Sequence, residues 1–405
     1  MMQPLEGIKV VDLSTWIMAP VCAATLGDWG AEVIKIEPLE TGDDFRWFLN
    51  VIENDESEMP VTLFQMNNRN KRGMAIDIKE PEGREIMNKL IGEADIFVSN
   101  IPMESLASLG MDYSHLSAIN PRLIYAHATG FGDKGPDAPK PGFDATAYWA
   151  RSGMMAGLAF EGGEPISQPT AGIGDQVSGL VLFGGVLPAL YNRERTGRGQ
   201  EVDLSLLGVG TWVTSCALQF VLSTGGPHPR LPRDQVLAPL SNHYQTKDDK
   251  WIYLACLPSD PYWEPLCQAL ALEDLIEDPR FNTLEARVEN SLELISILDR
   301  VFASKTGEEW GRLMDDYGIV WSHIPLSFEE VTKDPQILAN NYIVEVDHPS
   351  LGPAKIVNTP IHLNKKAPSI RRFAPELGQH TEEILLELNY TWEEIGELQE
   401  KGVIP

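Results

Sequence analysis

The fold class is decided by the stretch IKVVDLSTWIMAPVCAATLGDWGAEVIKIE, residues 8–37. The run IKVVDLS (8–14) predicts a strand, VCAATLGDWG (21–30) a helix, and EVIKIE (32–37) a second strand. The alternation continues through GMAIDI (73–78), the helical PEGREIMNKLIGEA (81–94), DIFVSN (95–100) and RLIYAHATG (122–130). Short β-branched runs that alternate with helices are typical of a parallel sheet covered on both faces. The sequence therefore predicts an α/β fold with a doubly wound parallel sheet.

The length of 405 residues predicts two domains, because it exceeds one ordinary core. After about residue 205 the alternation ends, and STGGPHPRLPRDQVLAP (223–239) is rich in proline and glycine. TWVTSCALQFVL (211–222) predicts a buried helix, and ENDESE (53–58) predicts a solvated loop. The predicted divisions are a large domain over 1–205, a linker over 206–225, a smaller α+β domain over 226–325, a linker over 326–341 and a last segment over 342–405.

Composition and charge argue against several classes of function. The net charge of −27 disfavours nucleic acid and anionic membranes as partners, because both require a surplus of Lys and Arg. We expect no membrane span, since no apolar run reaches the roughly 18–20 residues needed. The four cysteines form no CxxC pair, the N-terminus does not resemble a signal peptide, and a cytoplasmic location is expected. The eight histidines are scattered without ligand spacing, so no metal site is predicted.

The first strand and turn invite a dinucleotide-binding interpretation, with Glu37 ending the second strand as the ribose ligand. The turn STWIMAPVCA (14–23) contains no glycine, so its backbone cannot approach a pyrophosphate closely. A nicotinamide-dependent oxidoreductase is therefore disfavoured. The basic segment NNRNKRG (67–73) leaves two interpretations open. Either Arg69, Lys71 and Arg72 hold ligand phosphates, with Asn68 and Asn70 donating hydrogen bonds, or the segment is a solvated turn.

Asp175 lies in GIGDQVSG (172–179), directly before the apolar run of a predicted helix. One interpretation is an N-cap, since aspartate accepts backbone N–H bonds of a first helical turn. The other is a reactive carboxylate, kept ionised by the helix N-terminus and approached by a substrate over the flanking glycines. Gly184, Gly185 and Pro188 are expected to bend or interrupt this helix.

Taken together, these segments resemble the family III CoA-transferases from about residue 5 to 404. The motifs that carry the resemblance are LEGIKVVDLS (5–14), NRNKRGMAIDI (68–78), ADIFVSN (94–100), NPRLIYAHATGFGDKGP (120–136), GFDATAYWARSG (142–153), GIGDQVSG (172–179), ERTGRGQEVDLSLL (194–207) and HTEEILLELNYTWEEIGELQEKGV (380–403). Within the family, KPGFDATAYWARSGMMAG (140–157) and APLSNHYQTKDDKWIYLAC (238–256) are most similar to the transferases acting on phenyllactate and 2-hydroxyisocaproate. The second segment lacks the glycine-rich loop of formyl-CoA transferases, which disfavours formyl or oxalyl substrates.

The resemblance implies that coenzyme A is a co-substrate, carried in an acyl-CoA, and that Asp175 is the nucleophile. It implies an aspartyl-acyl anhydride followed by an aspartyl-CoA thioester, without a metal. It also implies that residues 342–405 return to the large, CoA-binding domain and that two chains form an interlocked homodimer. The candidate CoA-binding residues are Asn68, Arg69, Lys71, Asn100, Ile101 and Asp144.

Two further features bear on the reaction and the acyl group. Racemases of the superfamily use the histidine of a GHD motif, whereas this chain has Phe143, which cannot transfer a proton. Trp16, Ile17 and Met18, with Phe143, are the candidate substrate pocket, and an apolar Ile17 where formyl-CoA transferase has glutamine favours an apolar acyl group. A CoA-transferase is the favoured function; the alternatives are a racemase-like epimerase and a non-catalytic acyl-CoA-binding protein.

Overall fold

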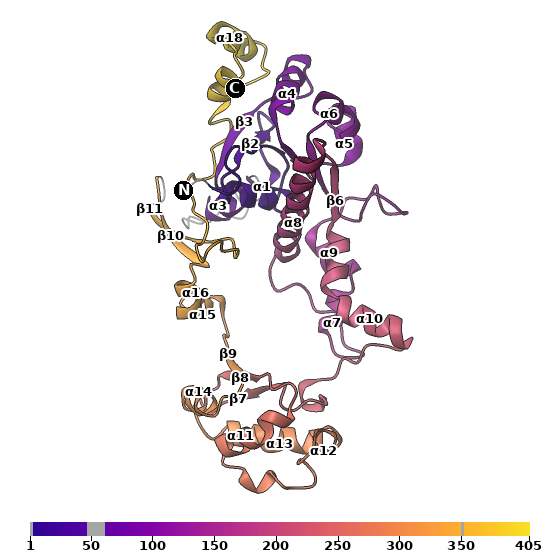
Figure 1. Cartoon of the computed structure of the whole chain (residues 1–405), viewed down its shortest axis with the longest axis vertical. Coiled ribbons are helices and arrows are strands. Elements are labelled where there is room, and N and C mark those ends of the chain that lie inside the picture. Colours follow the sequence, from indigo (N-terminus) through magenta and orange to yellow (C-terminus); the bar gives the residue numbers. More distant parts are fainter. Residues whose placement is uncertain (1–2, 47–60, 350–351) are drawn as a thin grey trace. The chain divides into compact units, whose positions relative to one another are not determined.

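The computed structural model describes residues 3–46, 61–349 and 352–405 (Figure 1). The predicted loop ENDESE (53–58) lies outside these ranges. The chain divides into two compact units. Unit 1 comprises the described residues within Met1–Ala156, Pro165–Gly226 and Ala339–Pro405, and unit 2 comprises Gly157–Glu164 and Pro227–Leu338. The short segment 157–164, which belongs to unit 2, was not separated from the large domain by any sequence signal.

The centre of unit 1 is a six-stranded sheet of order β3-β2-β1-β4-β5-β6, with every neighbouring pair parallel. Its strands are β1 (Lys9–Leu13), β2 (Glu32–Glu37), β3 (Lys71–Ala75), β4 (Ile96–Ser99), β5 (Ile124–Thr129) and β6 (Glu201–Ser205). The order reverses between β1 and β4, which is the doubly wound arrangement. The α/β prediction with a parallel sheet is therefore confirmed.

Two apolar cores cover the two faces of this sheet, because successive side chains of a strand point to opposite faces. Val10 of β1 packs into the first core, whereas its neighbour Val11 packs into the second. The helices of the first face are α1 (Met18–Asp28), α8 (Ile173–Thr196), α9 (Leu206–Val213) and the π-helix η1 (Asp144–Arg151). The helices of the second face are α4 (Pro81–Glu93), α5 (Met103–Ser108), α6 (Tyr113–Ile119), α17 (Thr381–Glu387) and α18 (Trp392–Glu400).

Helix α8 crosses α1 at very short range, and this contact brings two distant parts of the sequence together. A Cβ atom on Gly179 would lie 2.4 Å from the carbonyl oxygen of Met18 and 2.7 Å from Cβ of Val21. Only glycine permits this approach.

Helix α8 is continuous from Ile173 to Thr196 and contains Pro188, so the expected interruption of the helix is not observed. Helix α8 is long and apolar enough to span a membrane by length and composition, which corrects the expectation from apolar runs, and it packs in the core of unit 1.

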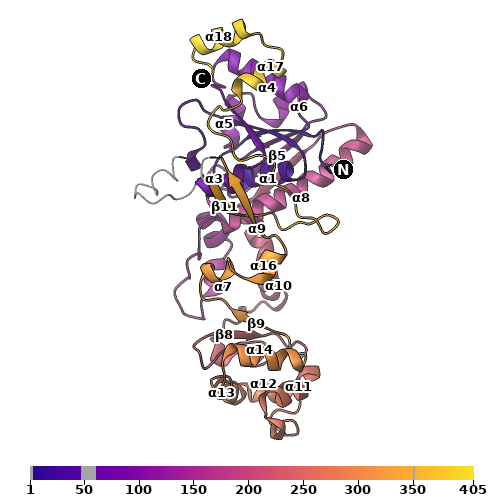
Figure 2. The same ribbon diagram turned by 90° about the vertical axis from the view of Figure 1, so that its left-hand side faces the viewer.

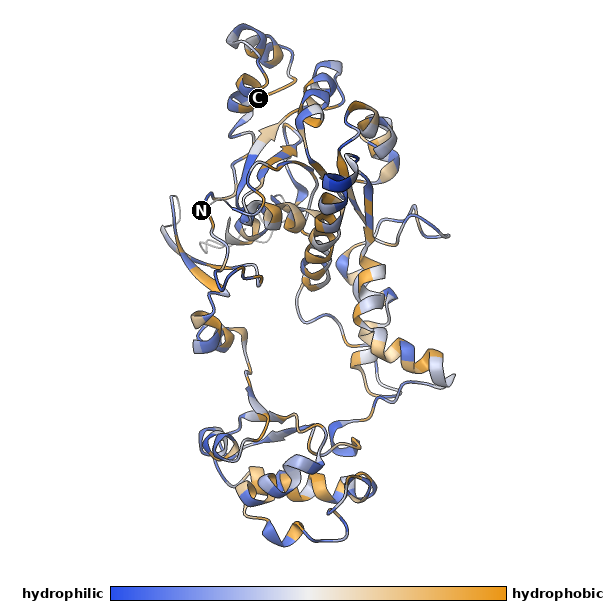
Figure 3. Cartoon of the chain, in the orientation of Figure 1, coloured by the Kyte–Doolittle hydropathy of each residue, from blue (hydrophilic) through white to orange (hydrophobic). Residues whose placement is uncertain are grey.

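The predicted linker over 206–225 consists of α9 and α10 (Ser215–Thr224) and belongs to unit 1. The expectation of a buried helix at 211–222 is wrong for the single chain: Trp212 is 75% exposed and Leu222 is 77% exposed. Figure 3 shows the apolar residues of both helices in orange. The apolar pattern is real, but within one chain most of these side chains have no core to enter.

Unit 2 pairs a small antiparallel sheet with a helical layer (Figure 2). The strands, in the order β7-β8-β9, are β7 (His243–Gln245), β8 (Trp251–Leu254) and β9 (Trp321–Ile324). The main helices are α11 (Asp260–Leu270), α12 (Leu284–Glu289), α13 (Ser291–Phe302) and α14 (Gly307–Asp316). The predicted second linker, 326–341, includes the short helices α15 (Phe328–Val331) and α16 (Pro335–Ala339), and α7 (Met154–Leu158) lies where the chain first passes from unit 1 to unit 2.

The C-terminal segment packs on unit 1. It begins with the antiparallel hairpin of β10 (Ile343–His348) and β11 (Gly352–Val357), which contacts α3 (Val61–Asn68). Farther along, α17 contacts β3, and the backbone N–H of His380 donates to the carbonyl of Gly73 at 2.9 Å. These contacts bury one edge of the sheet.

Candidate active site

The turn between β1 and α1 holds Trp16 and Ile17 in a fixed conformation. Trp16 has a φ of 67°, a left-handed conformation that costs a non-glycine residue about 1–2 kcal/mol. Asn100, at the end of β4, clamps the preceding residue: its Oδ1 accepts the N–H of Thr15 at 2.9 Å and its Nδ2 donates to the Thr15 carbonyl at 2.8 Å. Met18 begins α1 and is buried in the first core. The turn therefore offers Trp16 and Ile17, but not Met18, to a ligand.

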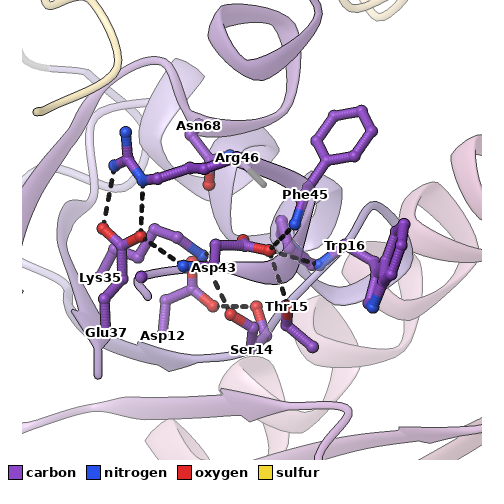
Figure 4. A network of polar contacts seen from close by, with 12 residues as sticks. Asp12, Ser14, Thr15, Trp16, Lys35, Glu37, Asp43, Phe45, Arg46 and Asn68 are labelled. Atoms are coloured by element: carbon purple, nitrogen blue, oxygen red, sulfur yellow. Dashed lines mark hydrogen bonds and ion pairs between the residues drawn. The ribbon is translucent and has the colours of Figure 1, made fainter. Parts of the chain in front are cut away.

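A group of buried ionic side chains lies beneath this turn (Figure 4). Lys35 and Asp43 pair at 2.8 Å with no exposed side-chain surface. Oδ1 of Asp43 accepts the Thr15 hydroxyl at 2.7 Å and the N–H of Trp16 at 2.8 Å. Burial opposes ionisation, but the charge and hydrogen bond of Lys35, together with the hydrogen bonds from Phe45 and Thr15, lower the pKa of Asp43. The carboxylate is therefore ionised and serves as the acceptor that fixes the turn.

The segment NNRNKRG is not a solvated turn. Asn68, Arg69 and Lys71 are buried, which corrects that interpretation. Nζ of Lys71 donates to Asp12 Oδ2 and to Asn68 Oδ1, each at 2.8 Å, and Arg69 pairs with Asp28 at 2.6 Å. Burial lowers the pKa of Lys71 to about 8. A phosphate would have to compete with Asp12 and Asp28 for these cations, so their contact with coenzyme A stays a prediction.

The start of α8 is capped by a residue from another part of the chain. Oδ2 of Asp144 accepts the N–H of Gly172 at 2.8 Å, and its Oδ1 accepts the N–H of Gly174 at 3.0 Å. Gly172 itself has a φ of 83°, which suits glycine. A Cβ atom on Gly174 would lie 2.2 Å from Asp144 Oδ1 and 2.3 Å from Cγ of Tyr148, so this approach also requires glycine.

Asp175 is therefore not the cap, because Asp144 takes that role from outside the helix. Asp175 lies in the first turn of α8 and is partly buried. Burial, and secondly the charge of Asp144, raise its pKa from 3.8 to about 7. The expectation that the helix N-terminus lowers this pKa is wrong, since loss of hydration and a like charge outweigh it. Burial likewise raises the pKa of Asp144.

The predicted pocket residues meet beside the same turn of α8. The ring of Trp16 lies edge-on to Phe143, with centroids 5.8 Å apart, and Phe143 is 54% exposed. A Cβ atom on Gly172 would lie 3.1 Å from Cδ1 of Ile17. The structure thus assembles Trp16, Ile17, Phe143 and Asp144 around the segment that carries Asp175.

Two contacts near the site were missed by the sequence reasoning. Nε2 of Gln176, the residue after Asp175, donates to Oδ1 of Asn67 at 2.8 Å and so ties α8 to α3. His127 is buried within β5, and its Nε2 lies 2.9 Å from the carbonyl oxygen of Ile101, which it fixes just after β4. An amide pair and a lone histidine carry no recognisable spacing, so no sequence signal points to them.

Within the described ranges, no cluster of three or more His, Cys, Asp or Glu side chains is arranged to hold a metal ion.

Comparison with known proteins places this geometry in a family. The sequence profile of CoA-transferase family III matches residues 5–381. The chain is 36% identical to the (R)-2-hydroxy-4-methylpentanoate CoA-transferase of Clostridioides difficile, over 99% of each chain. It is 31% identical to the cinnamoyl-CoA:phenyllactate CoA-transferase of Clostridium sporogenes, over 97% of this chain and 95% of the relative.

A solved structure extends the comparison to the fold. The crystal structure of a CAIB/BAIF family protein from Brucella suis matches with a TM-score of 0.80 and 30% identity, over 96% of this chain and 100% of that one. The profile, the relatives and the fold agree along nearly the whole length, and they confirm the resemblance drawn from the motifs. The chain is a member of CoA-transferase family III and an enzyme of that class.

Proposed function

We propose that this enzyme transfers CoA from an acyl-CoA donor to a 2-hydroxy acid such as phenyllactate or 2-hydroxyisocaproate, with Asp175 as the nucleophile. The observation that carries the proposal is the position of Asp175. It is a partly buried carboxylate in the first turn of α8, next to Asp144 and beside an apolar wall of Trp16 and Phe143. Its pKa of about 7 means that a large share is ionised near neutral pH, and a poorly hydrated carboxylate of raised pKa is a stronger nucleophile than a solvated one.

The proposed reaction divides one exchange into acyl and thioester transfers. A carboxylate oxygen of Asp175 attacks the thioester carbonyl, the carbon–sulfur bond breaks, and CoA leaves as the thiolate. The thiolate then attacks the aspartyl carbonyl of the mixed anhydride, releasing the donor acid and leaving an aspartyl-CoA thioester. The acceptor carboxylate then attacks the aspartyl-CoA thioester, which releases the CoA thiolate and forms a second mixed anhydride. The thiolate attacks the acceptor's carbonyl in that anhydride, so that the new acyl-CoA leaves and the carboxylate of Asp175 is restored. No water or net proton is consumed.

The start of α8 supports the charged intermediates of this sequence. Each attack on a carbonyl produces an oxyanion, which backbone N–H groups at a helix N-terminus stabilise. Asp144 occupies the N–H groups of Gly172 and Gly174, which leaves those of Ile173 and Asp175 as the candidate donors. The role we propose for Asp144 is thus to hold this turn in place beside the pantetheine arm rather than to contact the nucleotide.

The acyl group is proposed to lie against Trp16, Ile17 and Phe143. These apolar side chains suit an aryl or branched aliphatic 2-hydroxyacyl group better than oxalate. The two hydroxy-acid relatives described above support this substrate class. For coenzyme A, we propose that Asn100 and Ile101, which directly follow β4, line the ligand. Asn68, Arg69 and Lys71 are proposed to contact its nucleotide part.

We also propose a homodimer, interlocked as in the family. The supporting observation is the exposed apolar surface of α9 and α10, because side chains such as Trp212 and Leu222 are stabilised by burial against a partner. Size-exclusion chromatography with light scattering tests the stoichiometry, and a monomer of 44.9 kDa would contradict the dimer.

The test of the reaction is incubation with a panel of acyl-CoA donors and carboxylic acid acceptors, read by mass spectrometry. The expected result is CoA exchange with phenyllactate or 2-hydroxyisocaproate, and hydroxylamine or borohydride trapping of a modified Asp175. Exchange of an α-proton with deuterium, without transfer of CoA, would support an epimerase instead. Binding of acyl-CoA without any turnover, unaffected by Asp175→Ala, would support a non-catalytic binding protein.

A further inference from the structure

We propose that Asp43 is a positioning residue for the acyl pocket: it holds the Trp16–Ile17 turn against Phe143 and thereby sets which acyl groups the enzyme accepts. The inference rests on the proposed function of that pocket and goes beyond it, because the Asp43 side chain has no exposed surface and can act on a substrate only through the turn. The carrying observation is the convergence of hydrogen bonds on one buried oxygen. Asp43 Oδ1 accepts the Thr15 hydroxyl at 2.7 Å, the Trp16 N–H at 2.8 Å and the Phe45 N–H at 2.9 Å (Figure 4).

The turn needs such a restraint because its conformation is unfavourable. Trp16 has a φ of 67°, which an aromatic residue adopts only where its surroundings enforce it. Asn100 fixes the backbone of Thr15, the residue before Trp16. Asp43 supplies the restraint one residue farther along, at the N–H of the strained residue.

Asp43 is in turn fixed from both sides. Its Oδ2 pairs with Lys35 at 2.8 Å, and Nζ of Lys35 also donates to the Ser14 carbonyl at 3.0 Å. The Asp43 N–H donates to Glu37 Oε1 at 2.9 Å, and Glu37 is held by Arg46 at 2.7 Å. Buried ion pairs are weak contributors to stability compared with apolar packing, and their best-attested value is to fix one arrangement among several. Here the arrangement that is fixed is that of the turn.

The turn acts on the acyl group through two side chains. The centroid of the Trp16 ring lies 6.3 Å from that of Phe45 and 5.8 Å from that of Phe143. Phe45 is buried and Phe143 is exposed, so Trp16 connects the buried contacts of the turn to the surface of the pocket. Ile17 reaches Gly172 at the start of α8. A shift of the Trp16 backbone would therefore change the width of the pocket without touching Asp175.

The experiment uses Thr15→Val, which keeps the shape of the side chain and removes the hydroxyl that donates to Asp43; this hydroxyl also accepts the N–H of Asp44 at 3.1 Å. Thr15→Ser restores the hydroxyl. The matched control is Thr25→Val, which removes a buried hydroxyl that donates to the Val21 carbonyl at 2.8 Å within α1. The measured quantity is the ratio of kcat/KM for a bulky acceptor, phenyllactate, to that for a small one, lactate. Removing a hydrogen bond to a charged group is expected to change this ratio by about tenfold.

The expected result is a changed ratio in Thr15→Val, recovery in Thr15→Ser and the wild-type ratio in Thr25→Val. An unchanged ratio in Thr15→Val, or an equal change in Thr25→Val, would overturn the inference, because a purely structural role lowers both rates together. Should the wild-type enzyme transfer CoA to neither hydroxy acid, the substrate proposal fails. The ratio is then measured between a large and a small member of the acid class that it does use, and the inference about Asp43 is still decided.

Discussion

Replacing Asp144 by asparagine should change both the pH dependence and the rate of CoA transfer. The pKa of Asp175 is raised to about 7 first by burial and second by the charge of Asp144. An acid with a pKa of about 7 is roughly one tenth ionised at pH 6 and roughly nine tenths ionised at pH 8. Because the nucleophile is the ionised form, kcat/KM of the wild-type enzyme should rise about tenfold over this range.

Asp144→Asn removes the like charge, so the pKa of Asp175 falls and the midpoint of the profile moves below that of the wild type. The variant also loses one of two helix-capping bonds, because asparagine has a single carbonyl oxygen for the N–H groups of Gly172 and Gly174. A lost hydrogen bond to a charged group costs about 1.5–3 kcal/mol, so the high-pH plateau should fall by about tenfold or more.

The assay measures kcat/KM for one donor and one acceptor between pH 5.5 and 9, with the wild-type and variant enzymes in parallel. Asp137→Asn is the control, since it removes a partly buried carboxylate that pairs with the exposed side chains of Lys140 and Arg151. The control should keep the wild-type midpoint. A midpoint that stays the same or rises in Asp144→Asn would refute the assignment of Asp144 as the charge that acts on Asp175.

Three further predictions address other parts of the site. Asp175→Asn should abolish CoA transfer yet raise Tm at pH 8. The pKa of this carboxyl in the folded state exceeds its unfolded value of 3.8, so it lowers the stability of the protein as pH rises from 4 to 7. Scanning calorimetry should show the gain in Tm shrinking towards pH 4, and a variant less stable than the wild type at pH 8 would contradict this. Gly174→Ala should reduce kcat by at least about 100-fold, because its Cβ would displace Asp144 and Tyr148, whereas Gly184→Ala, with no atom within 4 Å, should have little effect in the same transfer assay. Ile17→Gln should weaken the use of bulky acyl-CoA donors by about tenfold, measured as kcat/KM across a donor series, and equal use of all donors would argue against an acyl group beside this residue.

The sequence predicted the sheet well because its signal is local. Strands β1 and β2 are short runs rich in β-branched residues, and β5 is buried almost throughout, so no polar alternation obscures them. Strand β3 lies at Lys71–Ala75 rather than at the predicted 73–78, and β6 (Glu201–Ser205), which has a single β-branched residue, was not predicted. The helices α9 and α10 were harder, since their apolar pattern is that of a core although Trp212 is exposed in the single chain. The spacing of apolar residues along a helix shows that one face is apolar, but it does not show whether the same chain or a partner covers that face.

The sequence pointed to residues that the structure brings together at the candidate site, but not to the contacts they make. GIGDQVSG identified Asp175, yet the sequence could not show that Asp144, 31 residues earlier, supplies the cap and raises the pKa of Asp175. The same limit applies to Arg69 and Lys71: a basic cluster is visible in the sequence, but the carboxylates that bury it, Asp28 and Asp12, come from α1 and β1. Such pairings depend on the crossing of distant elements, which no local pattern records.

The glycines of α8 divide the site into a part that can be redesigned and a part that cannot. On the side of Gly172 and Gly174 no side chain can be added freely: Gly172 has a positive φ, and a methyl group on Gly174 would lie 2.2 Å from Asp144 Oδ1. On the opposite side the wall is the side chains of Trp16, Ile17 and Phe143. If the proposed site is right, libraries that aim to broaden the acyl range should vary Trp16, Ile17 and Phe143, which leaves the proposed nucleophile, Asp175, and the glycines beside it unchanged.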